Sequence, residues 1–334
     1  MSIDPDPATR RPSRRAVLWG GAALVATPAV LAAQSSDFAA RAEGLDQLHA
    51  LVVRRGGEEV FARAYRGDGL DRVANVKSVS KTLVALLTGI ALERGAIESV
   101  DARVLPLLGR PATGDARDDV TVGHLLSMQA GLVRTSGASY GNWVSSGDWV
   151  DYILDREPEG QPGGRFIYST GGWHILGAVL SRLTGQSLLA LTRDWMADPL
   201  GIVVPPWVRD PQGRYLGGNE MALSPRGLSR VGQMVLDGGR WQGEQVVPAE
   251  WIARSWEPRA RSPWSGDRYG YGWFLTTMDG AEVAYGRGYG GQMLAVVPAR
   301  EMVICVTSDP MQPARSDGYF GDLRDLVAQI VAEA

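Results

Sequence analysis

The sequence is 334 residues long, carries a formal net charge of -3 and is 45% hydrophobic. This length and composition are typical of a globular protein with a well-buried core, and they exclude a disordered chain. The body of the chain has no lysine or arginine block, so the electrostatic signature of nucleic-acid binding is missing and we expect no nucleic-acid partner.

The N-terminus has the pattern of an export signal. Ser13-Arg14-Arg15 precedes an apolar stretch from Trp19 to Leu31, which ends in small residues at Ala32-Ala33. This order of charged, apolar and small residues is typical of secretory signals, and the paired arginines indicate the twin-arginine type. The apolar stretch is short for a membrane span. We therefore predict a signal peptide over residues 1–33, a periplasmic location, and a mature protein of residues 34–334 without a stable membrane span.

Strands are predicted near both ends of the chain, with helices between them. Two β-rich runs flank Gly56-Gly57, which is a hairpin signal over residues 48–65. Helical patterns follow at 78–93, 122–128, 149–154, 172–183 and 225–236. The pattern then returns to strands at 271–275, 282–285, 293–297 and 302–307, and a last helix is predicted at 321–332.

This order of elements predicts an α+β fold and argues against an alternating, parallel one. Strands from the N- and C-terminal segments are expected to form one antiparallel sheet flanked by helices, with a mainly helical lobe inserted between them. We expect a single domain, with a sheet lobe at about 45–95 and 265–334 and a helical lobe at about 96–264.

Lysine is almost absent from the chain. Of the 34 basic residues only Lys77 and Lys81 are lysines, and they flank Ser78. Arginine stays protonated at physiological pH, whereas a buried lysine can lose its proton and act as a base. Two lysines kept on either side of one serine therefore indicate that a deprotonated amine is needed here. The alternative is a coding bias toward arginine that left two lysines by chance.

Ser78-Val79-Ser80-Lys81 stands at the start of the predicted helix 78–93. Residues three apart share a helical face, so the Lys81 amine can reach the Ser78 hydroxyl. A neutral Lys81 can take the serine proton, and the helix N-terminus favours the oxyanion that develops. Lys77 either lowers the proton affinity of Lys81 as a like charge or is a solvated cation at the rim. Ser80 is expected to be structural.

This motif and two later ones resemble the serine β-lactamase and penicillin-binding protein superfamily. Within it the chain is similar to the branch of class C β-lactamases, carboxylesterases and 6-aminohexanoate-dimer hydrolases. The resemblance implies a β-lactamase-like fold in which Ser78 and Lys81 are catalytic. The second motif is Tyr168-Ser169-Thr170, where the family places a proton-relaying tyrosine, and Thr170 would then bind substrate. Close to two cations, the phenol of Tyr168 is expected to reach the phenolate form.

The third motif is Gly286-Arg287-Gly288-Tyr289, in the place of the family's K-T-G element. By the resemblance, the backbone N–H groups of Ser78 and Tyr289 form an oxyanion hole. Gly288 lets substrate approach the strand closely. The chain has neither the lysine of K-T-G nor the histidine of the H-x-G variant, so Arg287 is the residue that could replace this substrate-binding cation.

The other reactive residues are assigned to the core. Cys305 lies in an apolar run and is expected to be a buried, inert thiol. The three histidines have no metal-ligand spacing, and His174 is expected to be buried. The glycines from Gly286 to Gly291 match G-x-G-x-x-G, but a strand follows them where dinucleotide binding needs a helix. We therefore expect no metal or cofactor. Four tryptophans are expected to pack in the core or to line an apolar pocket: Trp143, Trp149, Trp173 and Trp207.

Together the motifs predict an exported serine hydrolase that cleaves an ester or amide bond of a small molecule through a serine acyl-enzyme. A β-lactamase or cell-wall D,D-peptidase is the close alternative, which export favours and the missing cation of the third motif opposes. A non-catalytic binding protein on the same scaffold is the third interpretation.

Overall fold

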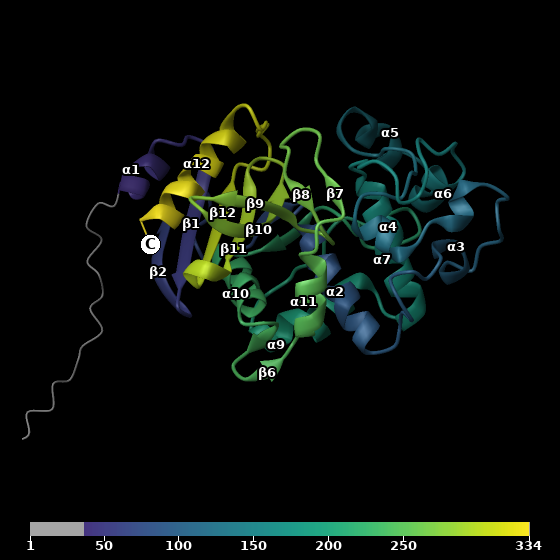
Figure 1. The fold of residues 1–334 in the computed structure, drawn as a ribbon, viewed down its shortest axis with the longest axis horizontal. Coiled ribbons are helices and arrows are strands. Elements are labelled where there is room, and N and C mark those ends of the chain that lie inside the picture. Colours follow the sequence, from purple (N-terminus) through teal and green to yellow (C-terminus); the bar gives the residue numbers. More distant parts are fainter. Residues whose placement is uncertain (1–36, 334) are drawn as a thin grey trace, which may run out of the picture. The chain divides into compact units, whose positions relative to one another are not determined.

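An eight-stranded antiparallel sheet, drawn from both ends of the chain, forms the core of the computed structural model, which describes residues 37–333 (Figure 1). The strand order is β2-β1-β12-β11-β10-β9-β8-β7. The strands are β1 Leu48–Arg55, β2 Glu58–Ala64, β7 Ala260–Arg261, β8 Arg268–Tyr269, β9 Phe274–Met278, β10 Ala281–Gly288, β11 Gln292–Val297 and β12 Met302–Ser308. The expected α+β class is confirmed. The predicted export signal lies outside the described residues.

The central strands of this sheet are covered on both faces. Every residue of β11 and β12 is buried, whereas the edge strand β2 is largely exposed. Helix α10 (Pro225–Leu236) packs on β1, β11 and β12, and helix α12 (Tyr319–Ala332) contacts β9 and the short α1 (Asp37–Glu43). Figure 1 shows α10 and α12 on opposite faces of the sheet. Burial of these apolar side chains is the main stabilising contribution to the fold.

The predicted hairpin and the β10–β11 turn both depend on glycine. Gly56 and Gly57 have φ angles of 55° and 84°, which are the left-handed values that a tight hairpin between twisted strands requires. Gly290 and Gly291 have φ angles of 80° and 93° in the turn between β10 and β11. A strand therefore follows this glycine-rich segment, as expected.

Helices are the main regular structure between β2 and β7. Their bounds are α2 Ser80–Glu93, α3 Val104–Leu107, α4 Val122–Leu126, α5 Tyr140–Val144, α6 Trp149–Leu154, α7 Thr170–Thr184, α8 Leu188–Thr192, α9 Asp198–Leu200 and α11 Ala249–Ser255. Within residues 37–333 no single helix is long and apolar enough to cross a membrane. The bent pair of α7 and Leu188–Leu200 passes that test only when taken together.

A second, two-stranded sheet joins the two parts of the chain beside α2. It pairs β3 (Ala74–Lys77) with β4 (Met221–Leu223), and the register shifts between Asn75 and Lys77. The sequence patterns did not predict either strand, because each is short and its partner lies about 150 residues away in the chain. This small sheet sets the position of the residues that follow it, starting with Ser78.

Candidate active site

Ser78 lies in the turn between β3 and α2. The Val79 N–H donates to Val76 O at 3.1 Å, and the Lys81 N–H donates to Ser78 O at 3.0 Å, so hydrogen bonds fix the turn on both sides of the serine. Helix α2 begins at Ser80, two residues later than predicted, and is buried from Ser80 to Ala91. The serine therefore stands just before a buried helix and at the wall of a cavity.

Lys81 is buried against Ser78. Its Nζ lies 2.9 Å from Ser78 Oγ, 2.6 Å from Gly218 O and 3.2 Å from Thr170 Oγ1, and the residue is only 2% exposed. Burial holds the pKa of Lys81 well below its ordinary value of 10.5 and therefore favours the neutral amine. A neutral amine has two N–H donors for Gly218 O and Thr170 Oγ1, and its lone pair can accept the Ser78 proton.

Lys77 does not act on Lys81 as the like-charge hypothesis expected. Its Nζ forms an ion pair with Glu220 Oε1 at 2.9 Å, and both side chains are mostly buried. Burial alone accounts for the lowered pKa of Lys81. Lys77 is therefore neither a solvated rim cation nor a charge that weakens the base.

Tyr168 lines the same cavity, but the expectation of an easily formed phenolate is wrong. The Lys81 Nζ lies over the Tyr168 ring, 4.9 Å from its centroid. Burial raises the pKa of Tyr168, and this effect outweighs the lowering by the Ser78 hydroxyl and by the Arg287 charge. The phenol is thus held in its protonated form, in which it can donate a proton.

A chain of hydroxyl groups supports Lys81 from the side of α7. Thr170 Oγ1, which Lys81 contacts, is 2.9 Å from Ser136 Oγ, and the Thr170 N–H donates to the same Ser136 oxygen at 2.8 Å. Thr135 Oγ1 is bonded to Ser169 Oγ at 2.8 Å and accepts from the Gly171 N–H at 2.8 Å. These bonds tie the second motif to residues 135–136 and fix the distance between α7 and the base.

The third motif runs along β10 into the turn beside Ser78. A Cβ atom at Gly286 would stand 2.6 Å from Thr82 Oγ1, whose hydroxyl is already bonded to Gly272 O at 2.7 Å. A side chain at this position, and hence a lysine, would require Thr82 to give up its hydrogen bond or α2 to shift. Arg287 lines the cavity, but its guanidinium is held toward residues 314–316, because its Nη atoms donate to Ser316 Oγ and Ala314 O, each at 2.9 Å.

Two backbone amides face this region from different elements. Ser78 and Tyr289 lie in turns, and neither N–H donates to another backbone group of residues 37–333. Gly288 precedes Tyr289, and a Cβ atom there would stand 2.5 Å from Val76 O. The missing side chain therefore allows β10 to approach the segment that carries Ser78. The oxyanion hole predicted for these two amides stays a prediction.

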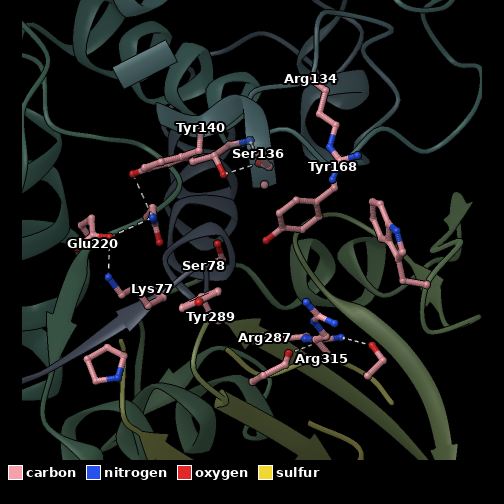
Figure 2. Close-up of a pocket in the computed structure, with 18 of the residues that line it drawn as sticks. Lys77, Ser78, Arg134, Ser136, Tyr140, Tyr168, Glu220, Arg287, Tyr289 and Arg315 are labelled. Carbon is pink, nitrogen blue, oxygen red and sulfur yellow. Dashed lines mark hydrogen bonds and ion pairs between the residues drawn. The ribbon is translucent and has the colours of Figure 1, made fainter. Parts of the chain in front are cut away.

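The cavity has a volume of about 1140 Å³ and differs on the two sides of Ser78. Figure 2 shows Lys77, Tyr140 and Glu220 on one side of the serine, and Arg134, Tyr168 and Arg287 on the other. All predicted site residues line this cavity except Lys81, which is buried and contacts Ser78 from within α2. Several lining residues had no periodicity or motif to predict them, among them Tyr140 at the start of α5 and five residues in loops: Arg134, Asn219, Glu220, Trp264 and Arg315.

The residues assigned to the core are buried as expected. Cys305 is fully buried, and burial raises the pKa of its thiol. His174 is also fully buried, with Nε2 3.1 Å from Asp210 Oδ2. Ser80 is structural, since its Oγ donates to Lys77 O and accepts from the Met221 N–H. None of the four tryptophans considered for a pocket lines the cavity; its tryptophan is Trp264, which is 54% exposed and has the Arg134 guanidinium 5.3 Å from its ring centroid.

Comparisons with known proteins cover most of the chain. The sequence model of the family described as Beta-lactamase matches residues 46–329. The esterase EstB of Burkholderia gladioli is 33% identical over 178 residues, which are 45% of this chain and 44% of EstB. The 6-aminohexanoate-dimer hydrolase of Paenarthrobacter ureafaciens is 26% identical over 323 residues, covering 86% of this chain and 81% of that protein. The structure of EstCE1, a hydrolase with promiscuous acyltransferase activity, has the same fold, with a TM-score of 0.71 and 18% identity over 87% of this chain and 98% of that chain.

Proposed function

The chain belongs to the Beta-lactamase family, and from this premise we propose that it is a serine hydrolase that cleaves an ester or amide through an acyl-enzyme at Ser78. The observation that carries the proposal is the buried Lys81 amine, 2.9 Å from Ser78 Oγ. Burial lowers the pKa of Lys81 well below its ordinary value and so favours a neutral amine, which can accept the proton of the serine hydroxyl.

The residues support a two-stage reaction. Ser78 Oγ attacks the carbonyl carbon while its proton passes to Lys81, and the N–H groups of Ser78 and Tyr289 stabilise the oxyanion. The protonated Tyr168 then donates a proton to the leaving oxygen or nitrogen and recovers one from Lys81. In the second stage water attacks the acyl carbon and gives its proton to the base, and Ser78 leaves with a proton restored to its oxygen.

We expect small esters or amides, and not β-lactams, as the substrates. The names of two relatives, an esterase and a 6-aminohexanoate-dimer hydrolase, describe ester and amide chemistry. Gly286 leaves no room for the family's lysine, and the hydrogen bonds of Arg287 hold it to residues 314–316. The cation expected to hold a β-lactam carboxylate is thus missing from its usual place.

The test is active-site labelling. A fluorophosphonate probe should label the wild type and should leave Ser78→Ala unlabelled, whereas equal labelling of both would contradict the proposal. A burst of p-nitrophenol from a p-nitrophenyl ester should match the enzyme concentration, because one acyl group is transferred to each serine. A folded wild type that shows neither label nor burst would favour the binding-protein interpretation.

A β-lactamase or D,D-peptidase is the second candidate, favoured by the family match over residues 46–329. Incubation with a fluorescent penicillin and with nitrocefin separates it from the main proposal. We expect no stable adduct and no turnover. A stable penicillin adduct, or hydrolysis of nitrocefin, would make this second candidate the better assignment.

Export is part of the proposal and has its own test. The twin-arginine pattern at Ser13-Arg14-Arg15 supports a periplasmic location for the mature enzyme. Fractionation of cells that express the full chain should recover the activity in the periplasm. Replacing both arginines by lysine should keep it in the cytoplasm.

A further inference from the structure

We propose that Asn75, Lys77 and Glu220 form an anchor that fixes the backbone next to Ser78, so that Lys77 positions the nucleophile and carries no proton in the reaction. The inference rests on the proposed function, because it assigns a positioning role at the same site. It also accounts for the second of the two lysines, which the mechanism does not use.

The anchor is a closed set of hydrogen bonds. Glu220 accepts from Lys77 Nζ at 2.9 Å through Oε1 and from Asn75 Nδ2 at 2.6 Å through Oε2. Asn75 Oδ1 in turn accepts the backbone N–H of Lys77 at 2.8 Å. Both the side chain and the backbone of Lys77 are therefore held, as Figure 2 shows for the pair of Lys77 and Glu220. The two charged side chains are only 14% and 21% exposed, so bulk solvent screens the pair poorly.

The backbone at both ends of this ion pair is in an unusual conformation. Lys77 has a φ angle of 48° and Glu220 one of 68°, and these are two of the six non-glycine residues with positive φ in residues 37–333. Residues other than glycine rarely adopt this region unless the surrounding structure holds them there. The ladder between β3 and β4 is also irregular between Asn75 and Lys77. Such irregularities redirect the chain, and here the next residue is Ser78.

The residues after Lys77 are joined to the same partner segment. Gly218 O accepts from Lys81 Nζ at 2.6 Å, and the Met221 N–H donates to Ser80 Oγ at 3.1 Å. Ser80 Oγ also donates to Lys77 O at 2.5 Å. Residues 218–221 thus contact the base, the anchor lysine and the start of α2 together. A shift of this segment would move Ser78 and Lys81 relative to the Tyr289 amide on the other side of the proposed oxyanion hole.

Glycine would adopt the conformation of Lys77 without strain, so the lysine needs another reason to be there. Its side chain supplies one, because its ammonium is the cation that pairs with Glu220, whose other hydrogen bonds come from the neutral amides of Asn75 and Asn219. This role differs from that of a charge acting on Lys81. A positioning residue changes the rate of acylation at all pH values, whereas a charge would shift the pH at which the base titrates.

The experiment is a double-mutant cycle on acylation, measured as the pre-steady-state burst with p-nitrophenyl acetate. Glu220→Gln should slow acylation about 10–100-fold, since small displacements of a nucleophile have effects of this size. Lys77→Gly should slow acylation less than Lys77→Ala does, because glycine adopts the positive φ angle of this position without strain and alanine does not. Adding Glu220→Gln to Lys77→Gly should cost nothing further, and the acid limb of the pH profile should stay in place in every variant.

A matched control removes a comparable ion pair outside the cavity. Glu59→Gln breaks the contact with Arg226 at 2.9 Å, where the carboxylate is 28% exposed, and should leave acylation unchanged. Lys77→Arg keeps a cation for Glu220 and should stay within about threefold of the wild type. Thermal unfolding of each variant separates positioning from loss of fold.

Independent, additive losses from Lys77→Gly and Glu220→Gln would overturn the anchor. So would an acid limb that moves when Lys77 is replaced, because Lys77 would then act as a charge on the base. A wild type without a burst would instead reject the proposed function, and the anchor with it.

Discussion

Lys77 and Lys81 are four residues apart and have opposite surroundings. Lys81 is buried among neutral oxygens, from Ser78, Thr170 and Gly218, and burial alone lowers its pKa. Lys77 is partly buried and meets the carboxylate of Glu220. The difference shows how one side-chain type can serve two purposes. A buried amine without a counterion loses its proton easily and can act as a base, whereas a buried amine with a counterion forms an ion pair that holds two segments together.

The largest expected effect comes from removing the base while keeping its charge. Lys81→Arg places a permanent cation beside Ser78, so kcat/KM for an activated ester should fall about 10²–10⁴-fold. For Lys77→Arg, the matched change, kcat/KM should fall by no more than about threefold. Equal losses in the two variants would erase the distinction between the lysines.

The next effect comes from giving Lys81 a counterion. Thr170→Asp places a carboxylate where Oγ1 now lies 3.2 Å from Lys81 Nζ, and a nearby anion favours the protonated amine. At neutral pH we expect kcat/KM to fall about 10–100-fold below that of Thr170→Asn, which has the same shape without the charge. The acid limb of the pH profile should move to higher pH only in the aspartate variant. Identical profiles would show that the charge of Lys81 does not limit the reaction.

A third change tests whether a lysine could stand in the third motif. Gly286→Ala adds only a Cβ atom, which would meet Thr82 Oγ1 at 2.6 Å. We expect the free energy of unfolding to drop by about 1–3 kcal/mol, as for other overpacked cores. Gly147→Ala, where the added atom would meet nothing within 4 Å, serves as the control in the same urea titration. An unchanged midpoint in Gly286→Ala would mean that the neighbouring side chains give way and that the close contact with Thr82 does not exclude a side chain there.

The smallest effect concerns stability. The pKa of Lys81 is lower in the folded protein than in the unfolded chain. At pH values between these two pKa values the unfolded chain binds more protons than the folded protein. The free energy of unfolding therefore rises with pH in this range. At neutral pH the buried lysine therefore costs stability. Lys81→Met should raise the free energy of unfolding by about 0.5–2 kcal/mol and flatten its pH dependence up to pH 10.5. A less stable methionine variant would mean that the hydrogen bonds of Lys81 outweigh its desolvation.

The sequence predicted the elements whose signal is local. The Gly56-Gly57 hairpin, the helices near 149–154 and 225–236 and the last four strands all follow from periodicity and turn residues. The spacing of Ser78 and Lys81 also sufficed to predict their contact. These features depend on residues that are close together in the chain.

Features that depend on distant partners were missed. The pairing of Asn75 with Ala222 and the ion pair of Lys77 with Glu220 have no periodic signal. The hydrogen bonds of Arg287 have no local signal either, because its acceptors, Ala314 and Ser316, follow after two further strands, β11 and β12. The protonation state of Tyr168 depends on burial by surrounding loops, which composition and spacing do not reveal.

The central claim is that Lys81 is the neutral base that activates Ser78, and its titration tests this most directly. The chain contains only two lysines, so selective ¹⁵N-lysine labelling gives two side-chain signals, and Lys77→Arg assigns the one that remains. We predict that Lys81 loses its proton well below pH 10.5 and that the pH dependence of acylation follows the same transition. A Lys81 signal that titrates at or above pH 10.5 would contradict the account.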